Sequence, residues 1–195
     1  MSSEKIETRT RILQATIETL EQSTAKAARM SDIAKAAGIS RQAVYLHFPS
    51  RTELLIEATL YKGDLLDVEA RLAPSRAAKT GVERLDRYIE FWGAFIPEIY
   101  PVGKSLMMVQ DTDEDAAAAW QGRMLAMKDG CRAAIEALYR DGDLAEGWTR
   151  PKAIDALWTM MLVPNWEHLT RECGWSEADY TRRMKFMARR LLVAG

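Results

Sequence analysis

The chain has 195 residues, of which 48% are hydrophobic and 28% are charged, as in an ordinary soluble globular protein. That length supports one sizeable core, or a small domain fused to a larger one. Residues 1–13 carry scattered charges where a signal peptide would be apolar, and the apolar run 156–166 is too short to cross a bilayer, so we expect a cytoplasmic protein without membrane contact.

The charge is unevenly distributed, although the net charge is only −1. Residues 1–51 hold eight Lys or Arg and five Asp or Glu, a net charge of +3. The remaining residues hold 19 basic and 23 acidic side chains, a net charge of −4. A basic N-terminal part on an acidic body suggests that only one end of the protein meets an anionic partner.

The apolar residues recur with helical periodicity, and runs that alternate as a β-strand would are almost absent. The first helix is predicted over residues 4–22. Two short helices follow within residues 31–48, and a long helix starts near Thr52. The fold class is therefore predicted to be all-α.

The second half of the chain gives further helices. A helix over residues 82–96 is expected to end at Pro97, with Pro101 and Gly103 punctuating the next segment. The later helices are predicted over about 115–139, 151–169 and 176–193. Thr149 can cap the second of these, Pro164 is expected to kink or end it, and Ser176 with Asp179 resembles a capping box for the last helix.

Residues 31–48 combine a short helix, a glycine and a second short helix, which is the pattern of a helix-turn-helix. Gly38 stands where the chain must reverse, since glycine adopts a positive φ without strain. Ser40 is a good N-cap for the second helix. The side chains predicted to face inward are Ile33, Ala34, Ala37, Ile39, Val44 and Phe48.

The outward face of the second short helix carries side chains that suit the major groove of DNA. Arg41 can donate two hydrogen bonds to guanine, Gln42 can pair with adenine, and Ala43 can meet a thymine methyl group. Other donors suit phosphate oxygens, which position a protein rather than specify sequence. These donors are Ser40, Tyr45, His47 and Arg51, the last in a helix start capped by the box Ser50–Glu53.

The stretch from Ile33 to Leu54 resembles the DNA-binding signature of the tetracycline-repressor (TetR) family over about 30 residues. The matched positions are Ile33, Ala34, Ala37, Gly38, Ile39, Ser40, Tyr45, His47, Phe48, Arg51 and Leu54. Two positions depart from the family pattern. Met30 stands where members usually carry Thr, and residues 23–29 lack the usual glycine and aromatic residue. We expect Ser31 to take over the capping and to be among the DNA-binding residues.

The resemblance implies an all-α protein of about nine helices: an N-terminal three-helix helix-turn-helix DNA-binding domain, residues 1–51, and a C-terminal helical ligand-binding and dimerisation domain, residues 52–195. It implies a homodimer, formed through the last two helices, on a palindromic double-stranded DNA operator. It also implies a repressor released by a small-molecule effector, with the long helix from Thr52 carrying the signal.

The body of the chain is rich in Trp and Met, which suit a largely apolar or aromatic effector. The residues predicted to wall such a pocket are Trp92, Phe95, Met107, Met108, Trp120, Met124, Met127, Trp158 and Met161. Helical spacing of such residues is equally what a plain core requires, so both interpretations stay open.

The sequence allows two other interpretations of the chain. Residues 31–48 could be a helical hairpin of a larger bundle, or the protein could be an all-α interaction protein whose degenerate helix-turn-helix no longer binds DNA. An enzyme is disfavoured, because the sequence has no glycine-rich phosphate loop, His-Glu-x-x-His motif or nucleophile elbow.

Other candidate sites are interpreted as structural. Cys131 and Cys173 lack metal-ligand spacing and are expected to be structural thiols; we expect no metal and no cofactor. His168 lies near Glu167 and Cys173 in sequence, a grouping too loose to predict catalysis. The acids within 111–115 indicate a solvated helix start, and Arg9 and Arg11 a solvated helix face rather than phosphate contacts.

Overall fold

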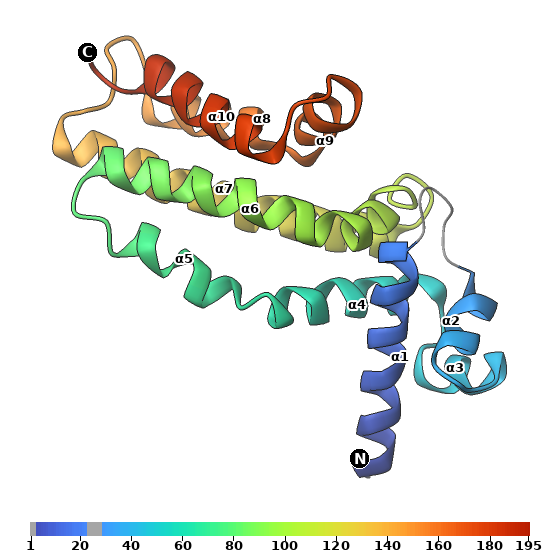
Figure 1. Cartoon of the computed structure of the whole chain (residues 1–195). Helices are drawn as coiled ribbons and strands as arrows, with labels where there is room; N and C mark the ends of the chain where they lie inside the picture. Colours follow the sequence, from blue (N-terminus) through green and yellow to red (C-terminus); the bar gives the residue numbers. More distant parts are fainter. Residues whose placement is uncertain (1–2, 23–28) are drawn as a thin grey trace. The chain divides into compact units, whose positions relative to one another are not determined.

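A computed structural model describes residues 3–22 and 29–195 (Figure 1). Within these ranges the chain forms ten α-helices and one π-helical turn, which confirms the all-α prediction. In chain order they are α1 (Ser3–Gln22), α2 (Met30–Ala36), α3 (Arg41–His47), α4 (Arg51–Leu65), α5 (Val68–Arg76), α6 (Gly81–Met107), α7 (Glu114–Asp141), α8 (Arg150–Met161), α9 (Val163–Glu167), the π-helical turn η1 (His168–Glu172) and α10 (Glu177–Leu192).

The helices form two compact units. Unit 1 comprises residues 1–67 and 99–122, and unit 2 comprises residues 68–98 and 123–195. The helices α6 and α7 therefore supply residues to both units. The division of the chain at residue 51, expected from the motif, stays a prediction.

Unit 1 is built around α1, which packs against α2 and α4, while α2 packs against α3. The largest apolar side chains at the centre of its core are at most 1% exposed, each worth about 1.5–3 kcal/mol of burial. They include Ile12, Ile33, Val44, Phe48, Leu54, Leu55, Val102 and Leu106. This core fixes α3 on one side only and leaves its other face open.

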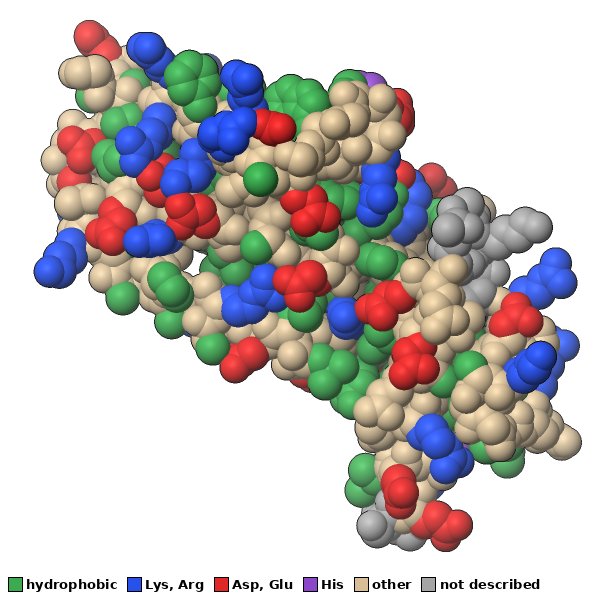
Figure 2. All heavy atoms as spheres, viewed as in Figure 1, with side chains coloured by type: hydrophobic (Ala, Val, Ile, Leu, Met, Phe, Trp, Pro, Cys, Tyr) green, Lys and Arg blue, Asp and Glu red, His purple; other side chains and the backbone are tan. Residues whose placement is uncertain are grey.

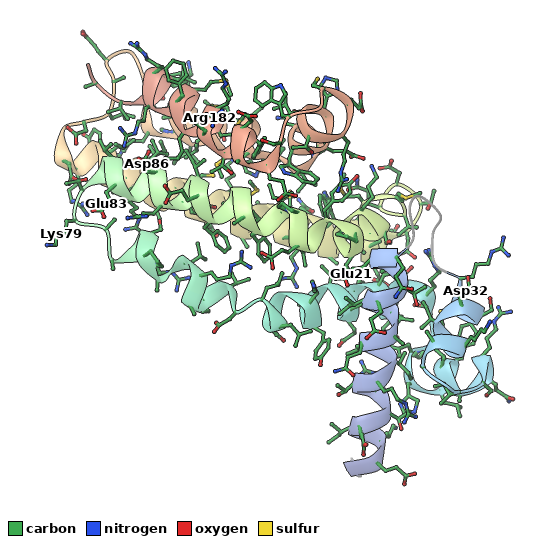
Figure 3. All side chains as sticks on the ribbon, in the orientation of Figure 1. Glu21, Asp32, Lys79, Glu83, Asp86 and Arg182 are labelled. Atoms are coloured by element: carbon green, nitrogen blue, oxygen red, sulfur yellow. The ribbon has the colours of Figure 1, made fainter. Side chains whose placement is uncertain are left out.

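Unit 2 is held together by polar contacts as well as by apolar packing. The Tyr88 hydroxyl on α6 donates to the Met127 carbonyl on α7 at 2.5 Å, and burial raises the pKa of that phenol. Asp86, labelled on α6 in Figure 3, pairs with Arg189 of α10 through a two-point hydrogen bond. Asp86 is 8% exposed, whereas the Arg189 side chain is 52% exposed, so this pair joins α6 to α10 at the surface.

The C-terminal end of α10 is fastened by backbone hydrogen bonds to the segment after α7. The Ala145 N–H donates to the Leu192 carbonyl at 3.0 Å, and the Ala194 N–H donates to the Asp143 carbonyl at 2.8 Å. Leu144 and Val193 form an isolated antiparallel bridge between these bonds. Within the described residues this bridge is the extent of β-structure.

The predicted helix end at Pro97 is wrong. The helix expected to end at Pro97 continues as α6 through Pro97 and Pro101 to Met107. Each of these two prolines in the helix interior costs about 3 kcal/mol. Val102 and Leu106, beyond them, are at most 1% exposed, and their burial at about 1.5–3 kcal/mol each offsets much of that cost.

The region around Pro164 behaves as predicted. The helix α8 ends at Met161, the chain breaks helical geometry at Leu162, and α9 starts at Val163 with Pro164 in its first turn. Thr149 occupies the N-cap position of α8, but its side chain makes no capping hydrogen bond. Ser176 caps α10 by accepting the Asp179 N–H at 3.1 Å, as expected.

Among the described residues, no helix combines the length and the hydropathy needed to cross a bilayer.

Candidate nucleic-acid interface

The turn between α2 and α3 has the geometry that the sequence predicts. Gly38 has a φ of +68°, a conformation that L side chains rarely adopt. Ser40 is the N-cap of α3, and its hydroxyl accepts the Ala43 N–H at 3.1 Å. The two short helices are therefore connected by a tight turn, and the start of the second helix is fixed.

The helix α3 has one buried face and one open face. Val44 and the following Phe48 are 0% exposed and anchor the helix in the core of unit 1. Arg41, Gln42 and Tyr45 are exposed together with Leu46, which is 77% exposed. A short helix with polar and basic side chains on its open face is what insertion into a major groove requires.

The predicted DNA-binding residues lie at different depths. The exposed ones are Ser31, Ser40, Arg41, Gln42 and Tyr45, and the half-buried ones are Ala43, His47 and Arg51. The structure brings two of them into contact, since the Arg41 guanidinium lies 3.4 Å from the Tyr45 hydroxyl and 5.5 Å from the centre of its ring. Arg51 opens α4, whose N-cap Ser50 accepts the Glu53 N–H at 3.0 Å.

The entry to the motif differs from the expectation that Ser31 caps α2. The N-cap position belongs to Arg29, whose N–H donates to the Asp32 carboxylate at 3.4 Å. Ser31 lies inside the first turn, because Met30 already belongs to the helix and is only 5% exposed. Met30 thus serves as a core residue. The connection through residues 23–28 lies outside the described residues.

Arg9 is a residue whose role the sequence did not reveal. Instead of facing solvent, its guanidinium donates to the His47 carbonyl at 2.6 Å and lies 4.2 Å from the centre of the Phe48 ring. It also forms an ion pair with Glu57 on α4 at 3.5 Å. Arg9 therefore joins α1 to the end of α3 and to α4, contacts between distant residues that no local pattern signals.

The start of α4 is also tied to the start of α7 within unit 1. The Thr52 hydroxyl donates to one oxygen of the Asp113 carboxylate, and the other oxygen accepts the Ala116 N–H at 3.0 Å. These hydrogen bonds hold the pKa of Asp113 below its usual range. The acids within residues 111–115, predicted to mark a helix start, do lie at the start of α7.

The residues predicted to wall a ligand pocket are divided between the two units. Met107, Met108 and Trp120 belong to unit 1, where Met108 is 58% exposed. The other six belong to unit 2: Trp92, Phe95, Met124, Met127, Trp158 and Met161. Their role as ligand contacts stays a prediction.

An aromatic cluster on α6 is the most distinctive part of unit 2. The Trp92 ring meets Phe91 and Phe95 edge to face, with ring centres 5.3 Å apart in both cases. The Arg71 guanidinium lies 5.8 Å from the centre of the Phe95 ring, so a cation already occupies one side of the cluster. The Trp92 indole N–H is buried without a hydrogen-bond partner.

A groove of about 520 Å³ runs between α6 and α10 in unit 2. Its walls combine small residues with charged ones: Glu90, Gly93, Ala94, Glu177, Ala178, Thr181, Arg182 and Lys185. Figure 2 shows basic and acidic side chains side by side over these helices. None of the nine predicted ligand residues lines this groove.

The N-terminal segment matches a known family. Residues 12–58 match the family model described as bacterial regulatory proteins, tetR family. This range runs from the core of α1 through the helix-turn-helix to the middle of α4. No curated protein matches the chain by sequence.

Solved structures share the whole fold. A protein from Saccharomonospora viridis, described as a transcriptional regulator and solved with choline, matches with a TM-score of 0.82 at 18% identity, over 97% of this chain and 99% of its own. NalD of Pseudomonas aeruginosa, the secondary repressor of the MexAB-OprM efflux pump, matches with a TM-score of 0.66 at 23% identity, over 98% of both chains. FadR of Bacillus subtilis, solved with stearoyl-CoA, matches with a TM-score of 0.70 at 14% identity, over 92% and 96%.

Proposed function

Since the chain belongs to the tetR family of bacterial regulatory proteins and is a DNA-binding transcriptional regulator, we propose that it is a homodimeric repressor of a palindromic operator, released by a small effector. The observation that carries the proposal is the open face of α3, on which Arg41, Gln42 and Tyr45 are exposed while the opposite face is buried in the core. In this proposal residues 1–51 form the DNA-binding domain and residues 52–195 the ligand-binding and dimerisation domain.

Recognition of the operator's base sequence is assigned to the first turn of α3. Arg41, Gln42 and Ala43 contact base edges, because their side chains match guanine, adenine and the thymine methyl group. Ser31, Ser40, Tyr45, His47 and Arg51 contact phosphates. The Arg41–Tyr45 contact supports this division, since it holds the guanidinium on the open face before DNA arrives.

Dimerisation is assigned to α8 and α10. Three large apolar side chains of α10 are exposed in the single chain, Phe186 at 55%, Met187 at 37% and Leu191 at 41%. Met187 and Leu191 are four residues apart and lie on one side of the helix, with Phe186 next to them around it. Pairing with a second copy would bury this apolar surface, and a two-fold dimer would read two half-sites about 34–36 Å apart if they occupy successive turns.

The effector is assigned to the Trp- and Met-rich residues of the helical body. Support comes from the aromatic cluster of α6 and from the partnerless buried N–H groups of Trp92 and Trp158, to which a ligand or water could offer an acceptor. A hundredfold loss of operator affinity needs only about 2.7 kcal/mol of differential binding. The ligands seen in two structural relatives, choline and stearoyl-CoA, belong in the first test set beside planar aromatic compounds.

The decisive experiment is selection of binding sites from a pool of random duplexes, followed by footprinting. A two-fold symmetric sequence bound with a steep salt dependence is expected, because neutralised phosphates release counterions. Failure to enrich any sequence, together with no salt-dependent binding to random duplex, would support an interaction protein that has lost DNA binding. Compounds are then tested for release of the selected duplex.

A further inference from the structure

In the turn before α10, an imidazole lies between a carboxylate and a thiol and contacts both. His168 opens η1, and its Nδ1 lies 2.9 Å from Oε2 of Glu172. Its other ring nitrogen, Nε2, lies 3.6 Å from Sγ of Cys173. The backbone supports this arrangement, since the Cys173 N–H donates to the His168 carbonyl at 2.9 Å.

The order of these contacts determines what each group can do. A Glu172 carboxylate accepts a hydrogen bond and so favours the tautomer of His168 that carries its proton on Nδ1. The lone pair of Nε2 then faces the thiol of Cys173. A nucleophile, a base beside it and a carboxylate that orients the base are the parts of an activated thiol.

All three side chains are open to solvent. His168 is 61% exposed and Glu172 is 68% exposed, and Cys173 is exposed as well. The other thiol of the chain has the opposite surroundings. Cys131 on α7 is 0% exposed, and burial raises its pKa to about 12. One chain thus holds an accessible thiol next to a base and a buried thiol that serves as its internal reference.

We propose that Cys173 is a covalent modification site for soft electrophiles of the activated-alkene class, with His168 as the base and Glu172 as the residue that positions it. Sulfur forms a bond to one alkene carbon while the thiol proton passes to Nε2. The π electron pair of the alkene moves to the neighbouring carbon, which then receives that proton. The product is a thioether, and the addition needs no oxidant and no leaving group.

The elements around the site carry charged side chains of both signs. Arg171 of the same turn stacks on the Trp166 ring, with 5.5 Å between guanidinium and ring centre. The neighbouring helices add the side chains Glu167 from α9 and Glu177, Asp179, Arg182 and Arg183 from α10. Among these, Asp179 is already engaged by Ser176 and by Arg182, whereas the His168 ring contacts the thiol directly.

The test uses N-ethylmaleimide on the full chain at pH 7, followed by peptide mapping and intact mass. One adduct on Cys173 is expected in the folded protein, with Cys131 reacting only after denaturation. The rate at Cys173 is expected to exceed that of the same residue in the denatured chain by about tenfold or more. Equal rates in folded and denatured protein, or a first adduct on Cys131, would overturn the proposal.

Variants separate base catalysis from simple exposure. His168→Ala and His168→Asn should both slow the reaction about tenfold or more, since neither side chain can take the proton. Glu172→Gln should give an intermediate rate, and Glu167→Gln, a neighbouring acid outside the three contacts, should react like the original chain. Unchanged rates in both His168 variants, with unchanged melting curves, would refute a base role. The readout is chemical, so it does not depend on operator or effector.

Discussion

Thr52 and Asp113 connect the first turn of α4 to the first turn of α7 through one carboxylate. Thr52 donates to it from α4, and the Ala116 N–H donates to it from α7. The same carboxylate therefore caps one helix and fastens the start of another. Because α4 begins directly after the helix-turn-helix, this hydrogen bond helps to fix where α4 starts within unit 1.

Replacing Thr52 with Val keeps the shape of the side chain and removes its hydroxyl. The variant is expected to melt about 2–4 °C lower at neutral pH. Asp113 has a lowered pKa in the folded protein, so its hydrogen bonds stabilise the charged form above the pKa of the unfolded chain and are lost as the pH falls through the folded pKa. The difference from the original chain should shrink between pH 7 and pH 3. Thr112→Val, whose hydroxyl donates elsewhere, is the control.

Substitutions of Arg41 and of Arg51 are expected to weaken DNA binding in different ways. Arg41→Ala should lower the discrimination between operator and mutated operator by about 1–3 kcal/mol, because a base contact is lost. Arg51→Ala should weaken all duplexes nearly alike and reduce the salt slope by about one. Titration of matched and mismatched duplexes at several salt concentrations measures both effects. An equal loss of discrimination in the two variants would contradict the proposed roles.

Arg9 is expected to stabilise the helix-turn-helix rather than to contact DNA. Its hydrogen bond to the His47 carbonyl and its stacking on Phe48 should make Arg9→Ala about 2 kcal/mol less stable in urea unfolding. Arg11→Ala, an exposed arginine on the same helix, should change stability by about 0.5 kcal/mol or less. Similar effects of the two substitutions would show that the contacts of Arg9 contribute little.

Replacing either of two glycines of α7 with alanine should change the stability of the protein, in opposite directions at the two positions. A Cβ at Gly130 would overlap the buried Tyr88 ring, so Gly130→Ala should destabilise the protein by about 1–3 kcal/mol. A Cβ at Gly122 meets nothing within 4 Å, and Gly122→Ala should stabilise the helix by about 0.5–1 kcal/mol. Thermal unfolding of the pair measures both signs. A stabilising Gly130→Ala would mean that α6 and α7 do not approach closely at Tyr88.

The proposed dimer is tested on α10. Phe186→Glu combined with Leu191→Glu places two charges on the exposed apolar side and should convert a dimer into a monomer. Light scattering at a fixed concentration gives the assembly state. Leu125→Glu, at a position of α7 that is 50% exposed, is the matched control and should leave the assembly unchanged. A monomeric original chain would refute the dimer.

The sequence was most informative where one residue type is required by local geometry. Gly38 with its positive φ, the N-cap Ser40 and the inward Phe48 were all predicted, because turn, cap and apolar periodicity are local properties. It was wrong at Pro97, since the local helix-breaking tendency of proline is offset by burial farther along α6, which only tertiary packing determines.

The candidate sites followed the same division. The exposed face of α3 could be predicted, whereas the interior role of Arg9 depends on residues 38 and 48 positions away. The contacts of His168 were missed for another reason. Glu172 follows it by four residues, a spacing that an α-helical turn brings onto one side, and this signal was present in the sequence. Cys173 follows it by five residues, a spacing that comes onto the same side because η1 is π-helical, which the sequence did not signal.

The end of α10 is secured by atoms that every residue other than proline possesses. The bonds from Ala145 to Leu192 and from Ala194 to Asp143 join main chains, so they do not depend on which exposed side chains α10 carries. The outward positions of α10 can therefore change for the sake of a partner surface, while the side chain of Leu192, which is 0% exposed, is fixed by the core. Proline at position 145 or 194 is the exception, because it removes the donor itself.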